Sequence, residues 1–94
     1  MRLSRMEKDV ILSAVKRVDP DAIVYLFGSR VDEEKTGGDI DILIYSKRIN
    51  LDGKLKIKNE IFKTLDAQKL DLVIREDMVD PFVQMVLENG IQLV

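Results

Sequence analysis

The feature of this sequence that most restricts its fold is an apolar run that ends in a glycine-serine turn and is followed by two alternating aspartates. The apolar run extends from Ala22 to Phe27, and the turn is Gly28-Ser29. After a charged loop, Asp39 and Asp41 open a second apolar run. Short runs with β-branched and aromatic residues predict buried strands. Because side chains two positions apart point to the same face of a strand, the two carboxylates are expected side by side at one end of it.

Helical spacing of apolar residues predicts two long helices. The first extends from Ser4 to Val18, and Ser4 with Glu7 matches a capping box at its start. The second follows the strand that begins at Asp39. Its apolar face is expected to consist of Leu51, Leu55, Ile57, Ile61, Phe62 and Leu65. Its other side carries Lys54, Lys56, Lys58 and Lys63, and we interpret it as solvated.

The end of the sequence predicts a third strand and a third helix. The segment from Leu70 to Ile74 is apolar apart from Asp71. Asp80-Pro81 then supplies a helix cap and a proline at the first helical position, and Gly90 is expected to end the helix. The tail from Ile91 to Val94 can add an edge strand.

This order of elements predicts a single domain over residues 1–94 with an α/β (α+β) fold, in which a small mixed sheet has helices packed on one face. The chain has 15 Lys and Arg against 17 Asp and Glu, a net charge of -2, which argues against broad nucleic-acid binding. There is no signal-peptide pattern at the N-terminus and no apolar run long enough for a membrane span, so we expect a cytoplasmic protein.

The glycine-serine turn is a candidate phosphate-binding element. Backbone N–H groups at Gly28-Ser29 and the serine hydroxyl can point at a phosphate, and a short helix expected after the turn would add its positive end. An ordinary turn with a serine cap would have the same sequence. Arg30 can reach the same phosphate, although it could equally pair with Asp32 or Glu33.

Three aspartates are the candidate metal ligands. Asp39 and Asp41 open one core strand and Asp71 opens the next. Acidic residues at strand ends are often only solvated, but three carboxylates this close would repel one another unless a cation balanced them. The chain has no cysteine or histidine, so a general base must be a carboxylate, a lysine or a metal-bound hydroxyl. Tyr45 is expected on the same side as Asp39, where it could stack on a base or belong to the core.

The pattern G-S-x9-D-x-D resembles the signature of the DNA polymerase β-like nucleotidyltransferases, in particular their minimal, MNT-type members. The resemblance covers most of the chain, and Asp71 stands where that family has its third carboxylate. It implies that Asp39, Asp41 and Asp71 bind Mg²⁺ and carry the catalysis, on the sheet face opposite to the helices. It also implies that Gly28 and Ser29 hold the β and γ phosphates of ATP. One departure is Gly37-Gly38, where many relatives have a serine and a loop one residue longer.

The function implied by this resemblance is Mg²⁺-dependent transfer of AMP from ATP to a hydroxyl group. Similar minimal members act as antitoxins that bind a small helical HEPN-type toxin and adenylylate a tyrosine on it, so such a toxin is the expected partner. A second copy of the chain is another candidate to cover the open face. Two other functions stay open: a binding module that neutralises a partner sterically, with or without nucleotide, and a regulatory domain that senses nucleotide without chemistry.

Overall fold

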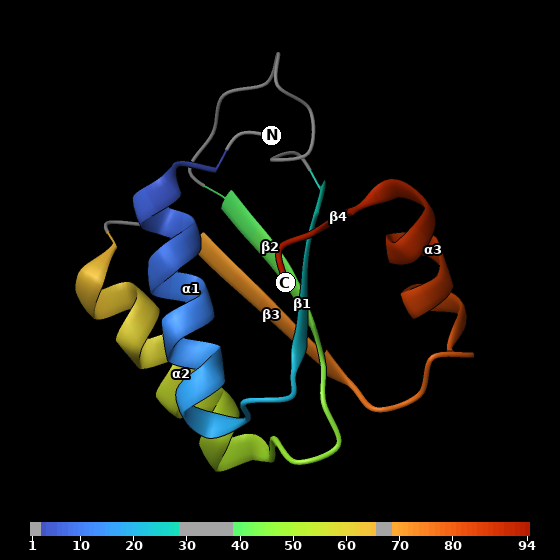
Figure 1. Ribbon diagram of the computed structural model, residues 1–94, viewed down its shortest axis with the longest axis horizontal. Helices are drawn as coiled ribbons and strands as arrows, with labels where there is room; N and C mark the ends of the chain where they lie inside the picture. The colour runs from blue at the N-terminus through green and yellow to red at the C-terminus, as the bar shows by residue number, and fades with distance from the viewer. Residues whose placement is uncertain (1–2, 29–38, 66–68) are drawn as a thin grey trace.

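The computed structural model describes residues 3–28, 39–65 and 69–94. It contains a four-stranded sheet with helices on both faces (Figure 1). For Asp39 and Lys69 the structure describes the backbone but not the side chain. The elements in chain order are α1 (Arg5–Val18), β1 (Ile23–Phe27), β2 (Asp39–Tyr45), α2 (Leu51–Thr64), β3 (Lys69–Arg75), α3 (Pro81–Asn89) and β4 (Ile91–Gln92). The expected α/β (α+β) class with a small mixed sheet is confirmed.

The helix starts follow the predicted capping chemistry. In α1 the Ser4 hydroxyl accepts a hydrogen bond from the Glu7 N–H at 3.1 Å, and the Glu7 carboxylate accepts one from the Ser4 N–H at 3.0 Å. In α3 the Asp80 carboxylate accepts from the Phe82 N–H at 2.8 Å, with Pro81 at the first helical position. These contacts satisfy N–H groups that have no partner within the helix.

The sheet has the strand order β3-β2-β1-β4. β1 is antiparallel to both β2 and β4, whereas β2 and β3 are parallel. A parallel pair needs a crossover, and α2 supplies it. The tail after α3 adds β4 to the edge of β1, so the predicted edge strand is present, although it has only 2 residues.

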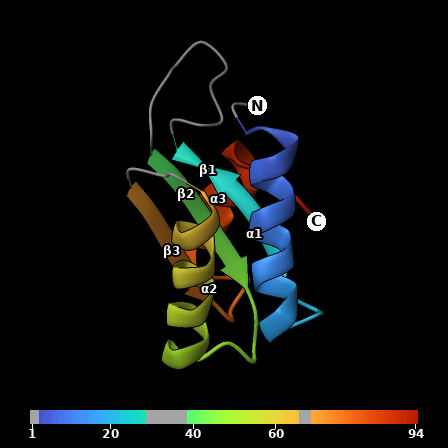
Figure 2. The ribbon, with the colours of Figure 1, turned by 90° about the vertical axis from the view of Figure 1, so that its left-hand side faces the viewer.

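The larger hydrophobic core lies between the sheet and the layer formed by α1 and α2 (Figure 2). Alternate residues of the strands point into it because successive side chains of a strand face opposite sides. The strand residues buried in this core are Val24, Leu26, Ile40, Ile42, Ile44, Leu70 and Leu72. The helices contribute Ile11, Ala14, Val15, Ile57 and Ile61.

The third helix departs from the prediction that the helices pack on one face. Figure 2 shows α3 behind the sheet, on the side opposite to α1 and α2. There Val83 and Val86 pack against Tyr25 of β1 and Leu43 of β2 in a second buried cluster. The physical reason is that both strands are apolar on both faces over this stretch, so the second face also needs a cover.

The second helix is rotated relative to the predicted apolar face. The row that meets the core is Gly53, Ile57 and Ile61. Leu51, Leu55 and Phe62, which were expected in the core, are 69%, 49% and 40% exposed. A Cβ at Gly53 would lie 3.0 Å from Val18 Cγ1, so the glycine lets α2 approach α1 closely with this row inward.

A buried carboxylate links two connections at one end of the sheet, the one that precedes β1 and the one that follows β2. Asp19 is 2% exposed, and its Oδ2 accepts a hydrogen bond from Ser46 Oγ at 2.5 Å. The Ser46 oxygen in turn accepts from the N–H groups of Arg48 and Ile49 at 3.1 and 3.2 Å. The hydrogen bond from Ser46 is the main reason that the pKa of Asp19 lies below its ordinary value, in spite of burial, which acts in the other direction. The connections between α1 and β1 and between β2 and α2 are thereby joined.

Candidate functional site

The register of the three central strands brings two of the predicted aspartates together. Asp41 of β2 is paired with Asp71 of β3 on one side and with Phe27 of β1 on the other. Neighbouring strands lie about 4.8 Å apart, so carboxylates at paired positions are within reach of a common ion. Since Ile40 and Leu70 point into the core under α1 and α2, both carboxylates belong to the opposite face.

Gly28 ends β1 beside one of these carboxylates and has a left-handed backbone, with φ of 77°. A Cβ at this position would overlap the Oδ2 atom of Asp41 and lie 3.0 Å from its Cγ. The turn backbone is therefore packed directly against the Asp41 carboxylate. Glycine is needed here for the space as well as for the conformation. The sequence predicted that Gly28 lets a phosphate approach the backbone closely. The close contact in the structure is with the Asp41 carboxylate, and the phosphate contact stays a prediction.

The remaining predicted site residues are placed only in part. Asp39 is paired by its backbone with Lys69 and stands two positions before Asp41, so it belongs to the same face, but its side chain lies outside the described residues. Ser29 and Arg30 also lie outside them, as does the short helix expected after the turn. The structure thus brings together Gly28, Asp41 and Asp71. The roles of all six residues stay predictions.

The two described carboxylates differ in their exposure. Asp41 is half-buried between β1 and β3, whereas Asp71 is exposed on the edge strand. Among the side chains that the structure describes, no three potential ligands form a metal-binding group, and Asp39, the third expected ligand, is not one of them. Carboxylate oxygens from adjacent strands are hard ligands that suit Mg²⁺. Asp41 and Asp71 therefore offer the donor type that this ion prefers, and the third ligand, Asp39, stays a prediction.

An aromatic pair that the sequence analysis missed stands next to the carboxylates. Phe27, paired with Asp41 in the sheet, is half-buried and meets Phe82 of α3 edge to face, with ring centroids 5.4 Å apart. Phe82 also lies under the Arg75 guanidinium at 5.7 Å. Strand alternation alone could have placed Phe27 on the face of Asp41, but the packing of α3 on this face was needed to find its partner.

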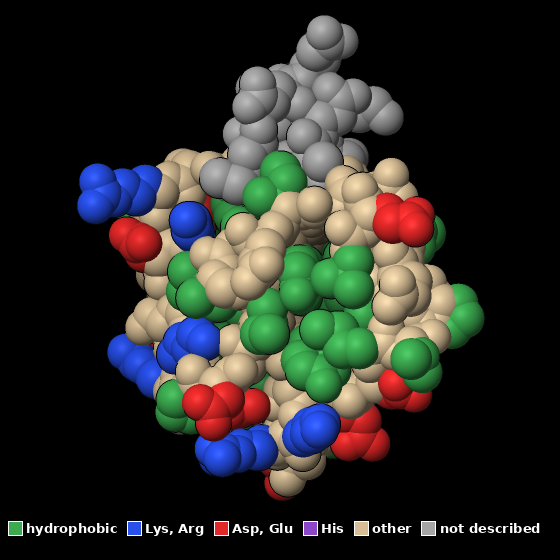
Figure 3. Space-filling view, turned by 45° about the vertical axis from the view of Figure 1, so that its right-hand side comes forward, with side chains coloured by type: hydrophobic (Ala, Val, Ile, Leu, Met, Phe, Trp, Pro, Cys, Tyr) green, Lys and Arg blue, Asp and Glu red, His purple; other side chains and the backbone are tan. Residues whose placement is uncertain are grey.

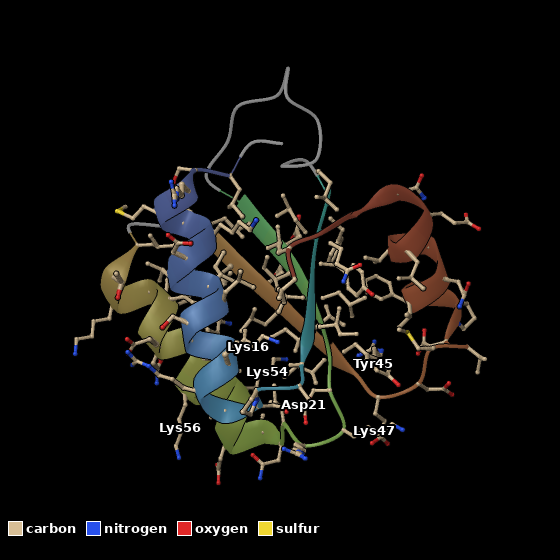
Figure 4. The ribbon with its side chains drawn as sticks, in the orientation of Figure 1. Lys16, Asp21, Tyr45, Lys47, Lys54 and Lys56 are labelled. Carbon is tan, nitrogen blue, oxygen red and sulfur yellow. The ribbon has the colours of Figure 1, made fainter. Side chains whose placement is uncertain are left out.

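Tyr45 lies on the same face as the aspartates but at the other end of its strand. Figure 4 shows it near the bottom of the sheet, close to Lys47. It stands four positions after Asp41, about 13 Å along a strand. A base stacked on Tyr45 would therefore be far from the carboxylates, so this candidate contact is not favoured by the geometry.

The face that includes α3 is apolar at its centre. Figure 3 shows hydrophobic side chains gathered there, with charged side chains around the rim. Tyr25, Leu43 and Val83 are buried below this face, and Val73 is half-buried. The carboxylates thus stand at the end of a sheet face whose other part is covered by a short helix.

Comparison with known proteins finds one family and a set of solved structures. The family model described as polymerase beta, nucleotidyltransferase matches residues 10–94. Among curated proteins, no significant match to this sequence is found. None of the helices in the described part of the chain combines the length and the apolar character needed to cross a membrane.

Two solved structures share the fold. One contains the tri-AMPylated Shewanella oneidensis HEPN toxin in complex with MNT antitoxin; the similarity has a TM-score of 0.71 and 23% identity and covers 96% of this chain and 71% of that chain. The other is a toxin-antitoxin complex with AMP-PNP, with a TM-score of 0.72 and 24% identity, covering 93% of this chain and 72% of that chain. At this identity the likeness concerns the fold.

Proposed function

We propose, from the premise that this chain belongs to the polymerase beta nucleotidyltransferase family, that it transfers AMP from ATP to a hydroxyl group of a protein partner. The observation that carries the proposal is the pairing of Asp41 with Asp71 beside the tightly packed Gly28 turn. A protein that bound its partner only sterically would have no physical need for two carboxylates at paired positions and a glycine fitted against one of them.

In the proposed reaction the site residues have different roles. Asp39, Asp41 and Asp71 would hold Mg²⁺, which supplies charge stabilisation for the phosphates and lowers the pKa of the attacking hydroxyl. Gly28, Ser29 and Arg30 would bind the triphosphate. In the transfer, a bond forms between the acceptor oxygen and the α phosphorus, the bond from that phosphorus to the bridging oxygen breaks, and pyrophosphate leaves. Asp71, the exposed carboxylate, would accept the hydroxyl proton.

The acceptor we propose is a tyrosine of a HEPN-type toxin, for which this chain would be the antitoxin. Support comes from the similar structure in which the HEPN toxin is tri-AMPylated and in complex with MNT antitoxin. The AMP-PNP in the second similar structure supports ATP as the donor. With ATP as donor, we place the reaction in the cytoplasm. The position of Asp71 on the edge strand also suits a large acceptor, because a protein can approach the site from that side.

The test uses ATP labelled at either the α or the γ phosphate, with Mg²⁺, the purified chain and a HEPN-type protein from the same source. We expect the α label, and not the γ label, on the HEPN protein. The variant Asp39→Asn/Asp41→Asn should transfer at least about 100-fold less. The matched control is Asp9→Asn, which removes an exposed carboxylate of α1 and should leave transfer unchanged.

Other outcomes identify the competing functions. Binding of the HEPN protein without any α label would favour the sterically acting module. Tight ATP binding without pyrophosphate release or partner binding would favour a nucleotide sensor. Full transfer by the double variant would show that the catalytic assignment is wrong.

A further inference from the structure

An apolar row on α2 faces away from the core. Leu51, Leu55 and Phe62 are separated by 4 and 7 residues, which places them on one side of a helix. They are 69%, 49% and 40% exposed, whereas the row on the other side, Gly53, Ile57 and Ile61, is buried. We call these three exposed residues the α2 stripe. Exposed apolar side chains are ordinary when scattered, but a row along one helix face is typical of an interaction surface.

Lysines stand on both sides of the α2 stripe. On the side toward β3, Lys54 lines a groove together with Leu51, and the Lys58 ammonium lies 6.0 Å from the ring centroid of Phe62. On the side toward α1, Lys56 lines a second groove, of about 600 Å³, and Figure 4 shows it pointing away from the sheet. Two acidic residues of α2, Asp52 and Glu60, stand against its four lysines, and Glu60 pairs with Arg17 of α1 at 3.3 Å. The flanks of the stripe therefore carry a net positive charge.

The α2 stripe is continuous with the strand that carries Asp71. β3 is the last strand of the sheet, and no described strand pairs with its outer side. A groove of about 400 Å³ runs between α2 and β3, with Leu51 on one wall and Leu72 to Arg75 on the other. A protein seated on α2 and over this groove would therefore reach the open edge of β3, where Asp71 is exposed.

We propose that the α2 stripe is the docking surface for the protein acceptor, and that the acceptor presents an apolar ridge flanked by carboxylates. This inference rests on the proposed function, because it assigns a place to the HEPN-type partner. Charge complementarity selects such a partner. A second copy of this chain with its own stripe in contact would bring the lysines of both copies together, which is unfavourable.

The experiment measures binding of the purified HEPN-type protein to variants of the full chain. Leu55→Glu/Phe62→Glu should weaken binding by at least about 100-fold, because it places charges in the centre of an apolar contact. Lys54→Glu/Lys58→Glu should weaken it by about 10-fold and remove most of its salt dependence. The matched control is Met85→Glu on α3, because Met85 is 48% exposed, nearly as much as Leu55. This variant should bind within about twofold of the wild type.

Binding of AMP-PNP, measured for each variant, separates a local effect from unfolding. The variants of the α2 stripe and of its flanking lysines should retain the wild-type affinity for the nucleotide, since α2 lies on the other face of the sheet from Asp41. If Leu55→Glu/Phe62→Glu loses nucleotide binding as well, Leu55→Ser and Phe62→Ser replace it, because they shorten the apolar side chains without adding charge. Each should then weaken partner binding by about 10-fold at unchanged nucleotide affinity.

Several outcomes would overturn the proposal. If the HEPN protein binds the stripe variants as well as the wild type, the docking surface is wrong while the proposed function stands. Loss of binding in Met85→Glu alone would assign the contact to the α3 face. A wild-type dimer that forms without the HEPN protein and disappears in Leu55→Glu/Phe62→Glu would assign the stripe to self-association. If the wild type binds no HEPN protein, the proposed partner fails and this inference fails with it.

Cross-linking tests the same contact independently. The sequence has no cysteine, so one introduced cysteine is a unique attachment point for a photoreactive group. Leu55→Cys should cross-link to the HEPN protein, and Met85→Cys should not. The cross-linked peptide of the partner should contain Asp or Glu residues within one helical turn of the attachment point. A peptide without acidic residues would contradict the charge complementarity.

Discussion

The two ends of the sheet both use aspartate, in opposite ways. At one end Asp19 is 2% exposed and accepts hydrogen bonds from Ser46 and from the Asp21 N–H. At the other end Asp41 is half-buried and Asp71 exposed, on paired positions of parallel strands. A buried carboxylate with its own donors is a structural element, because its charge is already compensated. The carboxylates of Asp41 and Asp71 stand at an accessible edge, and there we propose that they hold a ligand.

The surroundings of each carboxylate therefore indicate its role better than the residue type does. At the Asp19 end the donors come from the chain, and the side chains close two connections. At the Asp41 end the chain contributes a glycine whose backbone packs directly against the carboxylate, where a Cβ would overlap it. The first arrangement stabilises the fold, and the second is the one to which we assign nucleotide binding in the proposed function.

The largest effect that distinguishes the two ends is expected from Gly28→Ala. The new methyl group would overlap the Asp41 carboxylate, and the alanine backbone would have to keep the positive φ of Gly28. We expect the rate of AMP transfer to fall by about 100-fold, because the carboxylate is displaced. The free energy of unfolding should fall by about 1–2 kcal/mol, measured by urea denaturation.

The double variant Gly28→Ala/Asp41→Asn then tests whether the glycine acts through the carboxylate. If it does, the double variant should be no less active than Asp41→Asn alone. Independent, additive losses would show instead that the Gly28 backbone contributes separately to the reaction.

An intermediate effect, on stability alone, is expected from Ser46→Ala at the other end. The change removes the donor to Asp19 and the acceptor for two backbone N–H groups. The free energy of unfolding should fall by about 1–3 kcal/mol, again by urea denaturation. The kcat for transfer, measured well below the melting temperature, should be unchanged. A loss of activity in the folded variant would break the division of roles between the two ends.

The smallest effect is the pH dependence of stability due to Asp19. Its pKa in the folded protein is lowered from the ordinary value of 3.8, chiefly by the Ser46 hydrogen bond. Between the folded and unfolded pKa values the unfolded chain binds more protons, so stability rises with pH in that window. The contribution is fully present above the unfolded pKa and is lost as the pH falls through the folded one. Urea denaturation from pH 7 down to pH 3 should therefore show a smaller decline for Asp19→Asn than for the wild type.

Local signals in the sequence predicted the elements well, because each has its own local cause. The cap of α1 at Ser4, the cap of α3 at Asp80 and the alternation of β2 require only a few neighbouring residues. The meeting of Asp41 and Asp71 was also predictable, since parallel strands of one core align their starting ends.

Longer-range packing was not predictable from these patterns. The rotation of α2 depends on Gly53 fitting against Val18 of another helix, so an apolar count along α2 selected Leu51, Leu55 and Phe62 wrongly. The placement of α3 depends on Tyr25 and Leu43, which make the second face of the sheet apolar. The helical periodicity of α3 does not tell which face of the sheet the helix covers. Both errors concern the packing of a helix: which of its sides faces the core, or which face of the sheet it covers. This packing is determined only when the sheet has assembled.

The parallel pairing of β2 and β3 has a consequence for the order in which the protein is made. Asp41 and Asp71 meet only after the chain has passed through α2 and returned, so their contact spans 30 residues of sequence. Contacts of this kind form late, because the intervening loop must be closed first. A chain emerging from the ribosome therefore has no complete carboxylate pair until β3 has been synthesised and docked. Any activity that depends on this pair is switched on by the folding of the crossover unit itself.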